Sequence, residues 1–140
     1  MSFSQKSQRY VKEKGEFDYI IPPDIASKPE LREKFEKHMS EVANLYQDFV
    51  NAGIKAEDAR AILPNATASS LVASLNLREL IHLANLRLCT RAQLEIRTLI
   101  KKMCDEVLKE EPWLKAHLVP KCERLGYCDE DKSCGRMPQR

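Results

Sequence analysis

The sequence predicts an α+β fold, a mostly helical chain with two short strands, and three observations support this class. One long segment and two shorter ones place apolar residues every three or four positions, the spacing of an amphipathic helix. Two short runs are instead rich in β-formers or alternate apolar with polar residues. The length suits one domain with its own core, so we expect a single domain over 1–140, with an irregular cysteine-bearing tail at 113–140.

The first expected elements are a strand and a long helix. FDYII, residues 17–21, is rich in aromatic and β-branched side chains, and Pro22 ends it because proline has no N–H to donate. Ser27 is the expected N-cap of a helix with a proline and an acid in its first turn, and Gly53 follows its end. The apolar stripe of this helix comprises Leu31, Phe35, Met39, Val42, Leu45, Tyr46, Phe49 and Val50.

The middle of the chain predicts a helical turn and the second strand. KAEDARAIL, residues 55–63, has helical composition and stops at Pro64. The following segment, NATASSLVASLN at residues 65–76, alternates in the two-residue period of a strand. The alternation sets Leu71, Ala73 and Leu75 against Ser70, Val72 and Ser74.

Two further helices follow the second strand. Asn76 can cap the helix in NLRELIHLANLRLC, residues 76–89. Thr90 and Gln93 resemble a capping box for the helix at 91–111, which the next residue, a proline, limits. We therefore expect helical structure through most of the second half.

Composition and charge restrict the class of protein. Lys and Arg number 23 against 21 Asp and Glu, a formal net charge of +2, without the clustered excess of a nucleic-acid-binding domain. The start has no apolar segment typical of a signal peptide, and 18 apolar residues never run together, so we expect a cytoplasmic protein. Its five cysteines are then expected to be thiols or metal ligands rather than disulfides.

The helix over 76–89 separates polar residues from an apolar arc. On a helical wheel Leu77, Leu80, Ile81, Ala84 and Leu88 share that arc, and Arg78, His82 and Asn85 form a polar stripe. Arg87 falls at the edge of the arc, so we expect it to be half-buried.

A half-buried guanidinium needs a partner, and it fits planar acceptors such as phosphates, carboxylates or imide edges. Arg60, before the AILP turn, poses the same problem. The structural alternative for both arginines is a salt bridge with Glu57, Glu79 or Glu95.

Residues 59–97, ARAILPNATASSLVASLNLRELIHLANLRLCTRAQLEIR, resemble the signature of the flavin-dependent thymidylate synthases. That signature has an Ala-Arg-x-x-Leu-Pro turn, then Asn-x-Arg-(Glu/Ser)-Leu, then Leu-Arg-x-x-x-x-Ala-Gln-x-Glu-Ile. The opening SFSQKSQRY is similar to the second half of another family motif, Arg-His-Arg-x-x-Ser-x-Asn-Glu-x-Ser-x-Arg-Tyr. Ser2, Ser7, Arg9 and Tyr10 fit it, whereas Ser4 and Gln5 stand where Asn and Glu are usual.

The resemblance implies reductive methylation of dUMP to dTMP, with FAD as cofactor and NADPH and methylenetetrahydrofolate as co-substrates. Protein nucleophiles are not required, and we find no Ser/His/Asp or Cys/His arrangement in the sequence. By analogy, Arg87 is the catalytic residue, since it would stabilise negative charge developing on the uracil ring. The implied dUMP-binding residues are Ser7, Arg9, Arg60, Arg87 and Gln5, and the implied FAD-binding residues are Asn76, Arg78 and His82.

The family's fold is an α+β domain assembled as a homotetramer with active sites built from several protomers. The resemblance covers the later part of that domain only, so we expect an upstream fragment to complete the FAD site and this chain to be inactive alone. One alternative is a non-enzymatic helical assembly remnant. Another alternative is an RNA-binding helical domain. The only feature that favours it is a cluster of cations, Arg87, Arg91, Arg97, Lys101 and Lys102. Acidic residues are interspersed among them and disfavour this alternative.

The tail raises the question of a metal. His117, Cys122, Cys128 and Cys134 could in principle close a tetrahedral zinc site. The tight Cys-x-x-Cys pair of structural zinc sites does not occur, so we assign no metal ligand. We interpret Cys89 and Cys104 as helix-packing residues.

Overall fold

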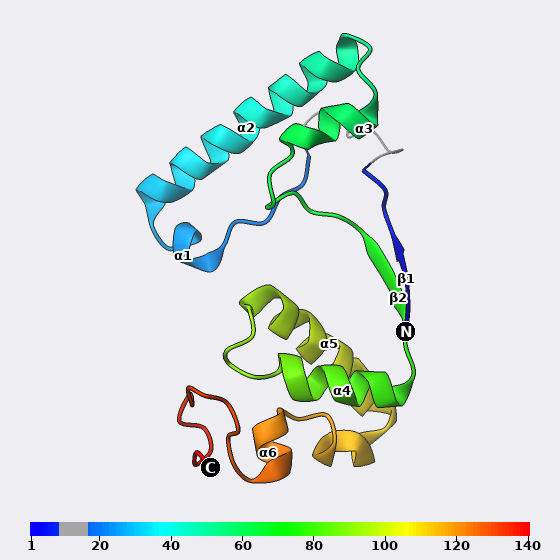
Figure 1. Ribbon diagram of the computed structural model, residues 1–140, viewed down its shortest axis with the longest axis vertical. Coiled ribbons are helices and arrows are strands. Elements are labelled where there is room, and N and C mark those ends of the chain that lie inside the picture. Colours follow the sequence, from blue (N-terminus) through cyan, green and yellow to red (C-terminus); the bar gives the residue numbers. More distant parts are fainter. Residues whose placement is uncertain (9–16) are drawn as a thin grey trace. The chain divides into compact units, whose positions relative to one another are not determined.

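The computed structural model describes residues 1–8 and 17–140, and the chain divides into two compact units (Figure 1). One unit is Phe3–Ala73, and the other combines Met1–Ser2 with Ser74–Arg140. Each unit is described by itself below.

The sheet has two strands, β1 (Ser2–Gln5) and β2 (Leu71–Ser74) (Figure 1). The Lys6 amide donates to the Ser70 carbonyl at 2.9 Å, which pairs the end of β1 with the start of β2 and makes the sheet antiparallel. The alternation over residues 65–76 therefore predicts β2 correctly, and the mostly helical α+β class is confirmed.

The prediction of a strand at residues 17–21 is wrong. Only Tyr19 pairs there, in an isolated antiparallel bridge with Thr67 that backbone hydrogen bonds of 2.8 and 2.9 Å flank. The pairing stops because Pro22 and Pro23 cannot donate to a ladder. The strand that pairs with β2 is β1 instead. Its short polar sequence has no strand pattern of its own, because its strand structure depends on a partner that is distant in sequence.

The unit Phe3–Ala73 holds one long helix. Its helical elements are α1 (Pro23–Ala26), α2 (Pro29–Asn51), α3 (Ala56–Ala59) and the 3-10 turn η1 (Arg60–Ile62). The expected long helix and the helical turn before Pro64 are thus confirmed. The expected cap is wrong, because Lys28 is the N-cap of α2 and the Ser27 hydroxyl donates back to the Asp24 carbonyl at 3.0 Å.

The core of this unit is smaller than the apolar stripe of α2. Phe17, Met39 and Ala43 form a buried cluster, and Tyr46 is 1% exposed. Leu31 and Leu45, at the margins of the stripe, remain exposed in the single chain. The helix therefore presents more apolar surface than its own unit covers.

The second unit begins with α4, which follows β2 directly along the chain. Gln93, rather than the expected Thr90, is the N-cap of α5, and its side-chain carbonyl accepts from the Ile96 amide at 3.2 Å. The Thr90 carbonyl instead accepts from the Arg97 guanidinium at 2.9 Å. The elements are α4 (Leu77–Arg87), α5 (Leu94–Glu110), the 3-10 helix η2 (Pro112–Ala116) and α6 (Lys121–Leu125).

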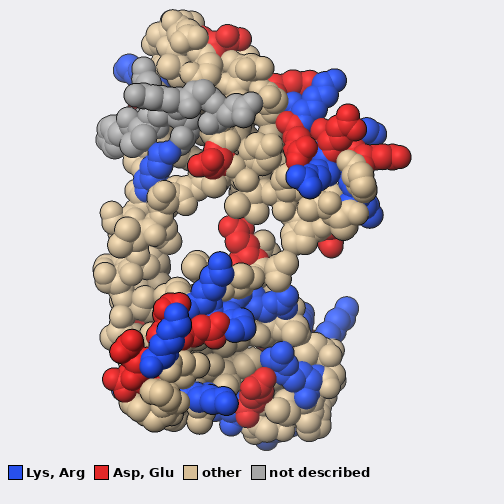
Figure 2. Space-filling view, turned by 180° about the vertical axis from the view of Figure 1, so that it is seen from behind, with Lys and Arg blue, Asp and Glu red and all other residues tan. Residues whose placement is uncertain are grey.

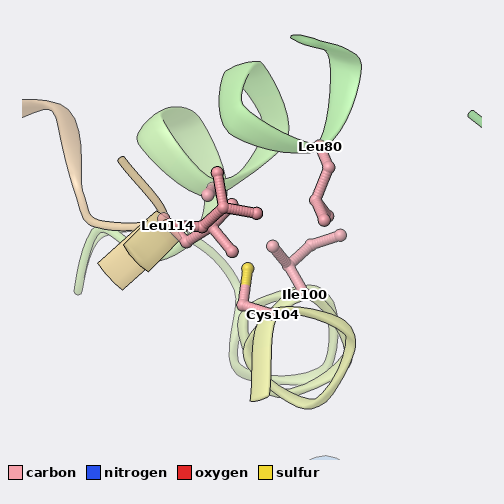
Figure 3. Packing of buried hydrophobic residues seen from close by; sticks show 6 residues of the cluster. Leu80, Ile100, Cys104 and Leu114 are labelled. Atoms are coloured by element: carbon pink, nitrogen blue, oxygen red, sulfur yellow. The ribbon is translucent and has the colours of Figure 1, made fainter. Parts of the chain in front are cut away.

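The core of this unit lies between α4, α5 and η2. Figure 3 shows Leu80 of α4 facing Ile100 and Cys104 of α5, with Leu114 of η2 beside them. All four side chains are at most 5% exposed. Cys104 is thus a packing residue, as its place in an amphipathic helix predicts.

Candidate functional site

The start of α4 carries the residues that the resemblance assigns to the flavin. The Asn76 side-chain carbonyl accepts from the Glu79 amide at 3.0 Å, so the expected N-cap is confirmed. Arg78 and His82 follow four residues apart on one face of the helix, and both are exposed. Because Asn76 caps with its oxygen, its amide nitrogen stays available to donate to a ligand.

Arg87 is exposed, so the expectation that it is half-buried is wrong. It is the last residue of α4, and its neighbour Leu86 is 45% exposed, so no later turn of the helix covers this edge. Neither Glu79 nor Glu95 pairs with it among the residues that the structure describes. A cation in the last turn of a helix is favoured by the helix dipole, which is its local structural role.

Arg78 and Arg87 differ from the other arginines of their unit. Within the described ranges, neither guanidinium has a hydrogen-bond or ion-pair partner, although both are exposed. The remaining five are all engaged by protein groups. These contacts are Arg91 with Glu130 at 3.1 Å, Arg97 with the Thr90 carbonyl at 2.9 Å, Arg124 with the Asn85 side-chain oxygen at 2.7 Å, Arg136 with Glu123 at 3.1 Å, and Arg140 with the Tyr127 hydroxyl at 3.5 Å.

The residues that the resemblance assigns to dUMP lie in different parts of the chain. Gln5 is exposed in β1, Ser7 is half-buried just beyond it, and Arg9 lies outside the described residues. Arg60 is exposed at the start of η1, where its Nε donates to the Glu57 carbonyl at 3.2 Å rather than to a carboxylate. These residues belong to one unit and Arg87 to the other.

Asn85 has a structural role that the helical wheel does not reveal. It is 7% exposed, whereas the other two members of its polar stripe, Arg78 and His82, are exposed. Its side-chain nitrogen donates to the Ile81 carbonyl at 2.7 Å, and its oxygen accepts from Arg124 at 2.7 Å. The sequence signal for this role of Asn85 is weak, because the helical wheel is equally consistent with a buried and with an exposed position for a small amide next to Ala84.

Cations and carboxylates are mixed on the face of the molecule that Figure 2 shows, where lysines and arginines are interspersed with aspartates and glutamates. Within the cluster on which an RNA-binding function would depend, Lys101 pairs with Asp105 at 2.6 Å and Arg91 pairs with Glu130 at 3.1 Å. These pairs neutralise two of its five cations. The described residues include no helix whose length and apolarity would suit a bilayer crossing.

Two cavities lie in the second unit, and neither is lined by the residues assigned to dUMP or FAD. The larger, of about 560 Å³, opens beside Leu94, Thr98 and Leu108 of α5. The smaller, of about 60 Å³, is lined by Cys89, Cys122, Cys128 and Cys134 among others. Cys89, which we interpret as a helix-packing residue, shares this cavity with Cys122, Cys128 and Cys134.

The cysteine environments differ in their effect on the thiols. Burial raises the pKa of Cys104, and burial is also the main cause that raises the pKa of Cys122. A hydrogen bond from the Thr90 hydroxyl is the main cause that lowers the pKa of Cys134, which is exposed. His117, the remaining member of the expected zinc set, lies outside this cavity with its ring 6.3 Å from that of Trp113.

Comparison with protein families gives a match over most of the chain. Residues 1–113 match the family model described as thymidylate synthase complementing protein. The flavin-dependent thymidylate synthase of Pyrococcus abyssi is 47% identical over 136 residues, which cover 92% of this chain and 56% of that protein. The protein of the same name from Nitratidesulfovibrio vulgaris is 45% identical, with 99% of this chain and 60% of that protein covered. The chain thus spans about three fifths of the length of these relatives.

A solved structure has the same fold. The UMP/dUMP methylase PolB from Streptomyces cacaoi, bound with 5-Br dUMP, aligns with a TM-score of 0.66 and 24% sequence identity. The alignment covers 77% of this chain and 57% of that chain. At this identity the likeness concerns the fold alone, and it agrees with the α+β class described above.

Proposed function

This chain belongs to the thymidylate synthase complementing protein family, and from that premise we propose that it works as a flavin-dependent thymidylate synthase. The proposed reaction is the reductive methylation of dUMP to dTMP, in the cytoplasm. Methylenetetrahydrofolate would supply the carbon, and NADPH the electrons. The family match and the paired motifs at both ends of residues 59–97 support this proposal.

The observation that carries the proposal is the contrast among the arginines. Arg78 and Arg87 are exposed without protein partners within the described residues, while the five other arginines of their unit are engaged. Free guanidinium groups are suited to anions and to the polar edges of planar rings. Within their unit, these two arginines are the ones that the resemblance assigns to FAD and dUMP; it also assigns Arg9 and Arg60, in the other unit, to dUMP.

The proposed roles in dUMP binding follow from the chemistry of each side chain. Ser7 and Arg9 would hold the phosphate, as hydroxyl and guanidinium donors do. Arg60 keeps charge-assisted donors available beyond its bond to a backbone carbonyl, and Gln5 can donate and accept through its exposed amide. Arg87 would face the uracil edge and stabilise negative charge that develops on the ring during the reaction.

The donor set at the start of α4 fits a flavin dinucleotide. The free amide nitrogen of Asn76, the guanidinium of Arg78 and the imidazole of His82 are donors on adjacent turns of one exposed helix end. A helix N-terminus also favours the negative charge of a pyrophosphate. When bound, FAD would supply the hydride, and these residues would orient it.

We propose that the site is completed by other copies of the chain in a homotetramer. Most of the assigned residues that the structure describes are exposed, and none of them lines either cavity; the exposed ones are Gln5, Arg60, Asn76, Arg78, His82 and Arg87. Large apolar side chains are exposed on the same elements, a pattern typical of surfaces that another subunit covers. These are Phe3 at 62%, Leu71 at 51%, Val72 at 70%, Leu77 at 40% and Leu86 at 45%.

Thermal unfolding with dUMP tests the proposed function. A ligand that binds only the native state stabilises it, by about 2.7 kcal/mol at a concentration of 100 times its Kd. We expect dUMP to raise the Tm of this chain, and uridine, which lacks the phosphate, to raise it far less. A folded chain whose Tm dUMP leaves unchanged would instead favour the alternative, a helical assembly remnant without nucleotide affinity.

A further inference from the structure

The end of the chain is held by few packing interactions. Residues 126–140 contain no helix or strand, and Cys128 is the one fully buried residue among them. Two backbone hydrogen bonds, from the Cys128 amide to Pro138 and from the Arg140 amide to Cys128, hold the segment together at 2.7 and 3.2 Å. The ion pairs that attach it, such as Arg91 with Glu130, are exposed and each contributes at most about 1 kcal/mol.

A segment with so little buried apolar surface usually needs a covalent or metal cross-link to stay folded. The chain offers the groups for one. Cys89 just after α4, Cys122 in α6, and Cys128 and Cys134 in the tail all line the cavity of about 60 Å³. Four cysteines from three separate segments therefore line one cavity, although they are up to 45 positions apart in sequence. The fifth cysteine, Cys104, lies elsewhere in the core.

The surroundings of Cys134 suit a thiolate ligand. Hydrogen bonds from the Thr90 hydroxyl and the Arg136 backbone amide are the main causes that lower the pKa of Cys134. Gly135, between them, has a φ of +81°, a left-handed conformation that glycine adopts readily and that lets the chain turn back onto the sulfur. Donors of this kind orient metal-bound thiolates and offset their charge.

We propose that Cys89, Cys122, Cys128 and Cys134 bind one zinc ion as four thiolates. Four sulfur ligands in tetrahedral geometry are a common structural zinc site, with Zn–S distances of about 2.3 Å. Each thiol loses its proton on binding, and the site carries a net charge of −2. Arg91 and Lys121 line the same cavity, each paired with a carboxylate that also lines it, Glu130 and Asp129, so the charge of the lining side chains is balanced before the metal binds.

Zinc binding must draw the sulfurs closer together. In the described part of the chain, no three His, Cys, Asp or Glu side chains are already arranged to hold a metal ion. The cavity wall contributed by the tail is irregular, so moving its two cysteines disrupts no helix or strand. Metal binding and folding of the tail are therefore coupled, as in other small metal-bound segments.

Cobalt titration of the whole reduced chain tests the proposal. Co²⁺ replaces Zn²⁺ in thiolate sites and gives visible bands of tetrahedral geometry with near-ultraviolet sulfur-to-cobalt bands. We expect one Co²⁺ per chain with the spectrum of four sulfur ligands, displaced by one equivalent of Zn²⁺. Cys128→Ser is expected to weaken Co²⁺ binding more than about 100-fold, beyond the effect typical of outer-sphere partners.

Two matched variants keep the test specific. Cys104→Ala removes the cysteine outside the cavity, and His117→Ala removes the histidine nearest in sequence to the tail cysteines. Both are expected to bind Co²⁺ like the parent chain. Cys134→Ser, at an exposed position where folding is not at risk, is expected to lose the four-sulfur spectrum.

Several outcomes would overturn the proposal. One is a reduced chain that binds no Co²⁺ tightly, and another is a spectrum that Cys128→Ser and Cys134→Ser leave unchanged. A loss of Co²⁺ binding in His117→Ala would also contradict the proposal, because it would show that His117 is one of the ligands. Mass spectrometry of the chain as isolated gives an independent answer, since a loss of two or four hydrogens would show disulfides in place of metal.

Discussion

The guanidinium of Arg87 ends α4 without a protein partner in the described residues, so its removal should affect chemistry and not folding. In a chain restored to full length with the upstream fragment, we expect Arg87→Ala to lower kcat about 100-fold or more, because one lost charge-stabilising donor typically costs that much. The free energy of unfolding should change by less than about 0.5 kcal/mol. Arg32→Ala, at an exposed arginine paired with Glu36 in α2, is the control and should leave kcat unchanged. Near-normal turnover by Arg87→Ala would contradict the assigned role.

Asn76 has a structural role and a proposed ligand role that substitutions can separate. Asn76→Asp keeps the carbonyl-type oxygen that caps α4 but loses the amide donor, so it should keep stability and weaken FAD binding. Asn76→Ala loses both and should also destabilise the fold by about 1 kcal/mol. The Gln93→Ala control removes the comparable cap of α5 and should leave FAD affinity unchanged. Flavin fluorescence titration and urea unfolding measure the two quantities, and an unaffected FAD affinity in Asn76→Asp would leave Asn76 with capping alone.

At the scale of the elements, Asn85 joins α4 to the segments that follow α5. It bonds Arg124 of α6 and also the His117 carbonyl, the latter at 3.4 Å. We expect Asn85→Ala to destabilise the chain by about 2 kcal/mol, because a buried bond to a charged donor is lost. Asn44→Ala, on the exposed face of α2, should change stability by less than about 0.5 kcal/mol. Urea denaturation measures both, and equal values for the two variants would contradict the role of Asn85.

The same elements show what the sequence could predict. Local signals placed α2, the helical turn before Pro64 and the Asn76 cap, because periodicity and capping depend on neighbouring residues. Two features of the structure could not be predicted from the sequence, and the physical reason is the same for both. The strand β1 and the cavity position of Cys89 depend on partners more than 30 residues away, and no local pattern encodes them. The prediction that Arg87 is half-buried failed because a helical wheel does not show where the helix ends.

For the whole molecule, the proposed shared site can be tested by mixing two inactive variants. Arg78→Ala and Arg87→Ala should each be inactive alone. If each site takes Arg78 from one subunit and Arg87 from another, random mixing in equal amounts leaves both arginines intact in about one quarter of the sites. With both variants and the parent restored to full length, we therefore expect the refolded mixture to recover about a quarter of the parent dTMP formation. A mixture as inactive as its components would show that both arginines of a site come from one subunit.

The length of α4 gives the reason for this expectation. Arg78 and Arg87 are nine residues apart on one helix, which is roughly 14 Å along its axis and about half a turn around it. A single helix thus points its two free guanidiniums away from each other, and one small ring cannot touch both. A hydride, however, passes only between atoms in contact. If the flavin ring lies at Arg78 and the uracil at Arg87, the helix that binds the donor in one reaction would bind the acceptor of a different one, and every subunit would serve two catalytic events at once.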